Sequence, residues 1–295
     1  METSRNQILK AHILLIMMTF VGGLHFIIAK VLMPQYIAPS GMILVRVLAA
    51  FVFFGLIHFF SSEKTNFERQ DYWRVIICAL LGVAVNQLMF FNGLALSKPI
   101  NASLIMLVSP VEVLVISILV LKLKVKWWQI LGVILGITGA FFLIFSNHAQ
   151  QAHEVLLGDI FIFINATAWS FYVVLVTPLM RKYPPFKVLT YTFAWGILFV
   201  LPFGYQDLVK VDWHILPMVA WEAFVYVIVL ATFFNYYVNT IVLKYITPAQ
   251  AGVYVYFQPV VASLVAVFLG RDDLTFQKIT FACLIFLGVY LVSKK

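Results

Sequence analysis

Long apolar runs, separated by short polar segments, recur along almost the whole chain. Their approximate bounds are 11–33, 39–60, 73–96, 100–121, 128–146, 156–180, 187–205, 217–243, 249–269 and 275–292. An α-helix needs about 20 mostly apolar residues to cross the hydrocarbon core of a bilayer. The runs lack the alternation of barrel strands, and backbone groups in hydrocarbon must be hydrogen-bonded within their own segment. The sequence therefore predicts an all-α integral membrane protein with ten transmembrane helices.

The amino-acid composition excludes the main soluble alternatives. Of the 295 residues, 63% are hydrophobic and only 11% are charged, whereas soluble domains average about 45–50% and about 25%. Such a chain cannot cover itself with polar surface, which excludes a soluble enzyme and a disordered tail. The net charge of +8 could suggest a nucleic-acid partner, but a bias of basic residues to one side of a membrane explains it better. No nucleic-acid partner is expected.

The distribution of lysine and arginine predicts how the helices are oriented. If both termini are cytoplasmic, fourteen of the 20 basic residues fall on the cytoplasmic side and five on the outside, with Arg46 inside a span. Cytoplasmic loops of membrane proteins carry an excess of lysine and arginine, and the reverse topology would invert this bias. We therefore expect cytoplasmic N- and C-termini and an external loop near residues 148–153.

The chain repeats itself at a shift of 149 residues. Residues 73–146 then align with 222–295 without a gap. The matched polar and proline positions include Asn86 with Asn235, Pro99 with Pro248, and Pro110 with Pro259. We predict two repeats of five helices each, 1–150 and 151–295. Because five is odd, the repeats must enter the membrane in opposite directions, as in many secondary transporters, whose binding site lies near the midplane between the repeats.

Several motifs resemble those of EamA-type transporters of the drug/metabolite transporter superfamily. Residues 23–30, GLHFIIAK, are similar to the family's WGxNFxxxK pattern, and the segment that begins at Arg46 is similar to its RfxxA pattern. The segment 93–110 resembles the family's junction between the third and fourth helices. The chain departs from the pattern at Gly22 and His25, where the family has tryptophan and asparagine. The likeness covers essentially the whole chain, so each predicted repeat is identified as an EamA repeat.

The resemblance implies a secondary active transporter that works by alternating access. We expect it to export small organic metabolites such as amino acids across the bacterial cytoplasmic (inner) membrane as a multi-pass protein. Its expected partners are a small-molecule substrate, the lipid bilayer and, as a candidate coupling ion, the proton. A sugar, nucleotide-sugar or drug permease of the same fold is the alternative. The sequence does not distinguish a monomer from a dimer.

Two other classes of function fit the sequence less well. An intramembrane enzyme would need a paired nucleophile and base or a metal cluster, and no such spacing is present. A phosphate-binding Gly-Lys-Ser/Thr loop is also absent from the sequence. We therefore expect no enzymatic activity, no cofactor and no metal. A structural membrane protein would not require polar positions that match between the two repeats.

Polar and aromatic residues recur every three or four positions on helices of both repeats. Such spacing places them on one helix face, and polar residues inside a membrane usually line a cavity or path. The candidate substrate-binding residues are His25, Asn86, Asn101, Ser109, Trp169, Tyr172, Asn235, Tyr254 and Gln258. For each of them the alternative is a structural role, in hydrogen bonds between helices or in filling space.

Glu112 is an acidic residue that the predicted spans place deep inside a helix. About 11 residues separate it from the helix start at Asn101, which is roughly 16 Å and hence near the bilayer middle. An ionised carboxylate there costs about 2.5–3.5 kcal/mol on insertion scales, so it should face a cavity or a partner. One hypothesis is that Glu112 exchanges a proton and couples transport to protons. The other is a structural role, either paired with Arg46 or hydrogen-bonded as a neutral acid.

Overall fold

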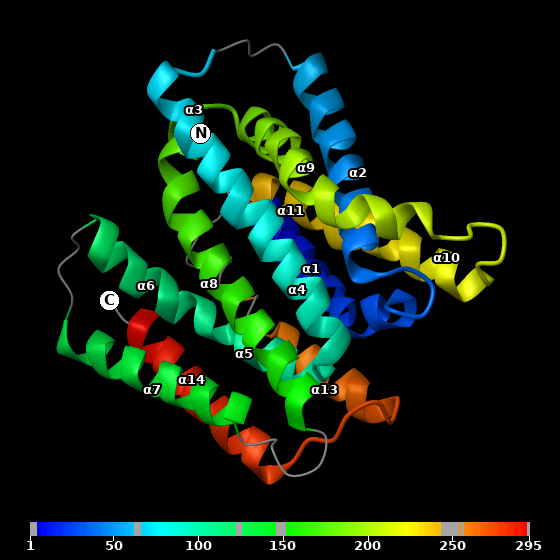
Figure 1. The fold of residues 1–295 in the computed structure, drawn as a ribbon. Coiled ribbons are helices and arrows are strands. Elements are labelled where there is room, and N and C mark those ends of the chain that lie inside the picture. The colour runs from blue at the N-terminus through cyan, green and yellow to red at the C-terminus, as the bar shows by residue number, and fades with distance from the viewer. Residues whose placement is uncertain are drawn as a thin grey trace.

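The computed structural model describes residues 5–61, 66–121, 126–145, 152–242, 254 and 257–293, which contain helices and no β-strand (Figure 1). The helices of the first half are α1 (Arg5–Leu32), α2 (Pro39–Phe60), α3 (Arg69–Ala79), η1 (Leu80–Val85), α4 (Asn86–Leu96), α5 (Pro99–Ile105), η2 (Met106–Val108), α6 (Ser109–Leu121) and α7 (Trp127–Phe145). Those of the second half are α8 (Ala152–Lys182), α9 (Pro185–Val209), α10 (Met218–Val225), η3 (Tyr226–Phe234), α11 (Asn235–Val242), α13 (Gln258–Phe268) and α14 (Phe276–Ser293).

Most of the predicted spans appear as long apolar helices. Within the described ranges, seven helical segments are long and apolar enough to cross a membrane, and three shorter apolar helices lie in the fifth, ninth and tenth predicted spans. The all-α, multi-pass membrane architecture is thus confirmed. The number of ten crossings and the orientation of the termini stay predictions. The start of the ninth span and most of the loop expected at 148–153 lie outside the described residues.

Helices of the first half pack against helices of the second half. α2 packs along α9, and α7 packs along α14, so the second and fifth spans each contact their counterparts in the other half (Figure 1). α1 contacts α11 and α13, while α8, which corresponds to α1 in the other half, contacts α4 and α6. Each contact therefore has a counterpart when the halves are exchanged, as two similar five-helix units packed together would produce.

Glycines allow α7 and α14 to approach each other closely. A Cβ atom built on Gly132 would lie 2.7 Å from the carbonyl oxygen of Gly288, and one built on Gly288 would lie 2.6 Å from that of Gly132. Neither distance is tolerable for real atoms, so any larger residue would push the helices apart. Small residues are a common means of helix association in lipid, where no hydrophobic effect drives it.

The outer surface of the helices is strongly apolar. Large side chains such as Phe20, Leu56, Phe142 and Phe203 are about half exposed or more. In water such a surface would lead to aggregation, whereas lipid tails solvate it. The core contains further aromatic residues, including the fully buried Phe54, which stacks against Phe193 with 5.8 Å between ring centroids. The exposed faces therefore suit contact with lipid, and functional polar side chains are expected in the interior of the helix bundle.

Candidate functional site

Two π-helical segments occupy matching positions in the two halves. The shift of 149 residues places η1 on residues 229–234 of η3, and each segment is followed directly by a predicted substrate-binding asparagine, Asn86 or Asn235. π-helical turns are rare and frequently occur at functional sites. The repeat seen in the sequence is therefore matched in the structure by a π-helical segment in each half, directly before Asn86 and Asn235.

The two asparagines make different contacts. Asn86 donates to the carbonyl oxygen of Asn165 at 3.4 Å, and Asn165 donates to that of Asn86 at 2.7 Å, so this pair joins α4 to α8. Asn235 donates to the carbonyl oxygen of Ala231 within its own helix at 3.3 Å. Its Oδ1 atom is buried and has no hydrogen-bond partner among the described residues. Asn86 thus has a structural contact, while Asn235 keeps a free acceptor.

His25 lies on α1 between aromatic rings. Its imidazole stacks on Phe90 at 5.6 Å between ring centroids and meets the edge of Phe91 at 5.7 Å. The residue is only 8% exposed. Neither ring nitrogen has a hydrogen-bond partner in the described part of the chain. Buried polar atoms are normally hydrogen-bonded, so the unpaired imidazole is an exception that requires an explanation.

Arg46 on α2 contacts only neutral acceptors. Its Nε donates to Thr232 Oγ1 at 2.6 Å, and its Nη2 donates to the carbonyl oxygen of Ala231 at 3.4 Å. The guanidinium carbon lies 5.3 Å from the centre of the Phe91 ring. The ion pair with Glu112 that we considered from the sequence is not formed, and over the described ranges no acidic side chain pairs with Arg46.

Glu112 on α6 is bound by two hydroxyl groups of α8. Thr167 Oγ1 lies 2.7 Å from one carboxyl oxygen, and Ser170 Oγ lies 3.1 Å from the other. Both hydroxyls also lie within hydrogen-bond distance of carbonyl oxygens of α8, at 3.0 Å for Thr167 and 2.8 Å for Ser170. Each hydroxyl has one proton, so it can donate to an ionised Glu112 or turn to its helix and accept from a protonated one. The site accommodates both protonation states.

The aromatic candidates of α8 lie together. The rings of Trp169 and Tyr172 are 5.2 Å apart, and Tyr172 is buried against Gly82 of η1, where any side chain would collide with the ring. Ser109 Oγ donates to the carbonyl oxygen of Met106 at 2.9 Å, so the hydroxyl proton is used in a bond to the preceding turn. Trp169 and Tyr172 thus form an aromatic pair at the middle of α8.

Two further candidates lie along α1. Tyr254 places its hydroxyl 2.8 Å from His12 Nδ1, and the side chain of Gln258 lies directly over Gly22. A Cβ atom built on Gly22 would collide with Gln258 Nε2, so a larger residue at this position would displace the Gln258 amide. Tyr254 is therefore directed at the N-terminal part of α1, apart from His25.

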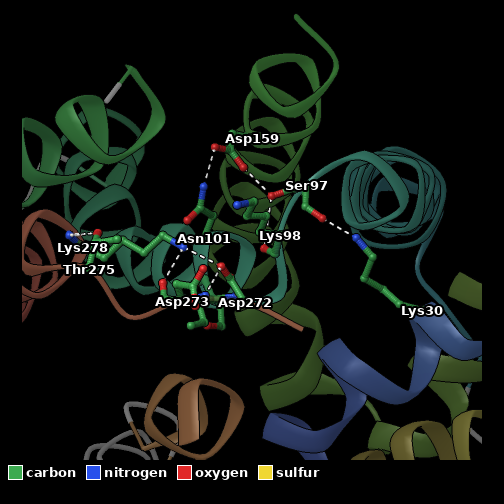
Figure 2. A network of polar contacts seen from close by, with 11 residues as sticks. Lys30, Ser97, Lys98, Asn101, Asp159, Asp272, Asp273, Thr275 and Lys278 are labelled. Carbon is green, nitrogen blue, oxygen red and sulfur yellow. Dashed lines mark hydrogen bonds and ion pairs between the residues drawn. The ribbon is translucent and has the colours of Figure 1, made fainter. Parts of the chain in front are cut away.

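The remaining candidate, Asn101, belongs to a polar cluster that the sequence analysis did not assemble. Asn101 is fully buried and donates to Asp159 Oδ2 at 3.1 Å, and Ser97 donates to the other carboxyl oxygen (Figure 2). Lys30, at the end of α1, donates to the carbonyl oxygen of Ser97. Asp159 could have been found by the argument applied to Glu112, because it is an acid inside a predicted span.

A buried ion pair completes this cluster (Figure 2). Lys278 Nζ lies 2.7 Å from Asp272 Oδ1, and the two side chains are only 4% and 0% exposed. Asp272 also accepts from the backbone N–H of Ile100 at the start of α5, where a negative charge stabilises the helix terminus. We call the set of Lys30, Ser97, Asn101, Asp159, Asp272 and Lys278 the Asp159 cluster. It ties α1, α5 and the α4–α5 turn to α8 and the start of α14.

A second cluster joins the halves at the other end of α8. Asp71 on α3 accepts from Tyr183 Oη and from Lys182 Nζ, both at 2.8 Å. Lys182 also pairs with Glu68 at 2.6 Å. We call these four residues the Asp71 cluster. Since 23 residues of α8 separate Asp159 from Lys182, the clusters lie roughly 35 Å apart along this helix.

Four of the candidates lie on α8 or are hydrogen-bonded to it, namely Trp169, Tyr172, Asn86 and Asn101. The ends of α8 carry the two clusters, and its middle turns carry Thr167, Trp169, Ser170 and Tyr172. In the described ranges, no three metal-ligating side chains come together. The arrangement can bind polar groups and exchange protons near the middle of the bundle.

Comparison with known proteins gives matches over the whole chain. A model of the EamA-like transporter family matches twice, at residues 9–145 and 156–294. The uncharacterized transporter YyaM of Bacillus subtilis is 24% identical over 97% of this chain and 94% of its own length. An uncharacterized transporter of Archaeoglobus fulgidus is 22% identical over 97% of this chain and 98% of its own. A WAT1-related protein of Arabidopsis thaliana is 25% identical over 59% of this chain.

The fold is also similar to that of a solved crystal structure. The superposition has a TM-score of 0.61 and covers 96% of both chains, at 18% sequence identity. At this identity the likeness shows the fold alone.

Proposed function

The chain belongs to the EamA-like transporter family, and from this membership we propose that it is a secondary active transporter that works by alternating access. The proposed cargo is a small organic metabolite such as an amino acid, exported across the cytoplasmic membrane of a bacterium. A sugar, nucleotide-sugar or drug permease of the same fold is the alternative. Family membership makes the protein a membrane transporter rather than an enzyme.

The observation that supports alternating access is the arrangement along α8. A polar cluster that joins the two halves lies at each end of this helix, and the middle turns carry Trp169, Tyr172 and the hydroxyls that contact Glu112. A carrier needs contacts that can close either end of a path around a central site. The proposed substrate-binding residues are His25, Asn86, Asn101, Ser109, Trp169, Tyr172, Asn235, Tyr254 and Gln258.

Glu112 is the proposed proton-coupling residue. It is 8% exposed, and within the described ranges its hydrogen-bond partners are hydroxyl groups and no cation pairs with it. The one-proton hydroxyls of Thr167 and Ser170 allow it to gain or lose a proton without any change in helix packing. A carboxylic acid with these properties suits coupling to a proton gradient.

Purified protein in liposomes tests the proposed function. Saturable counterflow of an amino acid is expected, and a panel that includes sugars, nucleotide sugars and drugs distinguishes the alternative. Trp169→Ala and Asn235→Ala should lower the rate without lowering the amount of inserted protein. The matched control is Leu201→Ala, on a lipid-exposed position. Counterflow of no solute in the panel would contradict transport, and full activity of both variants would contradict the site.

The coupling proposal has its own test. Glu112→Gln should keep counterflow, which needs no net proton movement, but lose the acceleration that a pH gradient gives to the wild type. Thr167→Val is the variant to compare with Glu112→Gln, because it removes one hydroxyl that contacts Glu112 and leaves the carboxyl group in place. Unchanged acceleration by the gradient in Glu112→Gln would contradict proton coupling through this residue.

The proposed orientation is tested by labelling. A cysteine placed at His153, near the start of α8, should react with a membrane-impermeant reagent from outside intact spheroplasts. A reaction that requires permeabilised membranes would contradict cytoplasmic termini. In the expected orientation, the Asp159 cluster faces the outside and the Asp71 cluster the cytoplasm.

A further inference from the structure

Arg46 is a charged side chain inside the helix bundle that has no charged partner among the described residues. It lies seven residues after the start of α2 at Pro39, or about 10 Å along the helix. Its hydrogen bonds in the described ranges go to a threonine hydroxyl and a carbonyl oxygen. Charged groups within a membrane are costly and almost always find an opposite charge or line a path. In the described part of the chain the opposite charge is missing, so the guanidinium retains capacity to bind an anion.

His25 provides a second donor next to Arg46. Both groups contact the ring of Phe91, at 5.7 Å for the imidazole and 5.3 Å for the guanidinium carbon. His25 is more than nine-tenths buried, and neither ring nitrogen has a partner among the described residues. A neutral imidazole offers one N–H donor and one acceptor, which a ligand would satisfy.

A buried acceptor without a partner in the described ranges belongs to an amide that shares a carbonyl oxygen with Arg46. The carbonyl oxygen of Ala231 accepts both from Arg46 Nη2 and from Asn235 Nδ2. The other atom of that amide, Asn235 Oδ1, is buried without a partner over the described ranges. Arg46 and the Asn235 amide thus meet at one carbonyl oxygen, so a donor for an anion and an acceptor for a cation lie near each other.

We infer that Arg46 and His25 bind the carboxylate of the transported solute, while Asn235 Oδ1 accepts from its ammonium group. The ligand class is an α-amino carboxylate, and the inference rests on the proposed function in that it names the chemistry of the cargo. Arginine suits this role because its planar fork matches the two oxygens of a carboxylate. The buried rings of Phe90 and Phe91 pack against the guanidinium and imidazole groups and make their surroundings apolar.

Binding to purified full-length protein in detergent tests the inference without any transport step. The probes are L-phenylalanine, L-leucine and L-threonine, each compared with its amide, which keeps the ammonium and the side chain but removes the carboxylate charge. 3-Phenylpropionate removes the ammonium instead. The readout is the rise in melting temperature with ligand concentration, which gives an affinity by mass action. Wild-type protein should bind at least one amino acid about tenfold or more tighter than its amide.

The variants identify the residues responsible. Arg46→Gln should bind the amino acid and its amide with equal, weak affinity, whereas Lys210→Gln, on an exposed lysine after α9, should keep the wild-type preference. His25→Phe retains the ring stacking and removes both unpaired nitrogens. It should fold with an unchanged or higher melting temperature and still lose most of the preference for the carboxylate.

Three results would overturn the inference. The first is that no amino acid of the panel binds, or that acid and amide bind equally well to the wild type. The second is an undiminished preference in Arg46→Gln. If Arg46→Gln does not fold, His25→Phe decides, and an undiminished preference in that variant is the third. Counterflow of a solute without a carboxylate would leave the transporter proposal intact while contradicting this site, so the two failures are distinguishable.

Discussion

The two clusters at the ends of α8 use similar chemistry in different surroundings. Each joins the halves of the chain through an aspartate: Ser97 and Asn101 donate to Asp159 in one, and Lys182 and Tyr183 donate to Asp71 in the other. In the Asp159 cluster the ion pair of Lys278 and Asp272 is 4% and 0% exposed, whereas in the Asp71 cluster Lys182 and Glu68 are 38% and 54% exposed. A buried ion pair is costly to separate because each charge is left without solvent, and an exposed pair is replaced by water at little cost. We therefore expect the Lys182–Glu68 pair to separate at a lower free-energy cost than the Lys278–Asp272 pair.

The largest effect is expected from Lys278→Met. Removing one partner of a buried ion pair leaves an uncompensated charge on Asp272, and such changes destabilise proteins by about 3–5 kcal/mol. The measurement is thermal or denaturant unfolding in detergent, with the exposed Lys210→Met as control. Equal stabilities of Lys278→Met and Lys210→Met would contradict the view that the buried ion pair of the Asp159 cluster is costly to separate. Adding Asp272→Leu to Lys278→Met should recover part of the loss, because no lone charge remains.

An intermediate effect is expected from Tyr183→Phe. The hydroxyl donates to the buried Asp71 and accepts from the backbone N–H of Glu68 at 2.9 Å. Loss of a hydrogen bond to a charged group costs about 1.5–3 kcal/mol. Unfolding should therefore shift by less than in Lys278→Met but more than in Tyr205→Phe, whose ring is 59% exposed. An effect equal to that of the control would show that the Asp71 cluster contributes nothing to stability.

A smaller effect is expected from Glu68→Gln. Its pair with Lys182 is exposed on both sides, and water and salt screen such pairs. The melting temperature should fall by less than in Tyr183→Phe, and raising the salt concentration should remove the difference from the wild type. A difference that persists at high salt would mean that the Lys182–Glu68 pair is as well shielded from solvent as the Lys278–Asp272 pair.

The smallest effect concerns pH. The Lys182 ammonium, which donates to Glu68, holds the pKa of this carboxyl below its ordinary value, with help from the Gln70 amide. A carboxyl whose pKa is lowered by folding contributes stability at neutral pH and loses it as the pH falls through the folded-state pKa. The small difference between wild type and Glu68→Gln should thus disappear in acid. Growth of that difference on acidification would contradict the assignment.

Part of the site could be read from the sequence, and part could not. Glu112 stood out because an acid inside an apolar run is conspicuous, and Asn86 and Asn235 stood out because the two repeats match there. The two π-helical turns before these asparagines, in contrast, have no sequence signature that we recognised. Asn101 was singled out from the sequence, but its contact with Asp159 was not, because the choice among polar neighbours depends on how helices from both halves meet.

The sequence by itself determined that this protein is helical and lies in a membrane, because apolar segments about 20 residues long have no other way to satisfy their backbone. It also determined the duplication, since matched positions are visible without coordinates. Only the tertiary structure decided that Arg46 lies away from Glu112, against Thr232 and beside His25. The reason is physical: contacts between helices far apart in the chain depend on their rotation and depth, and a repeating apolar pattern that serves lipid and core alike does not fix either of these.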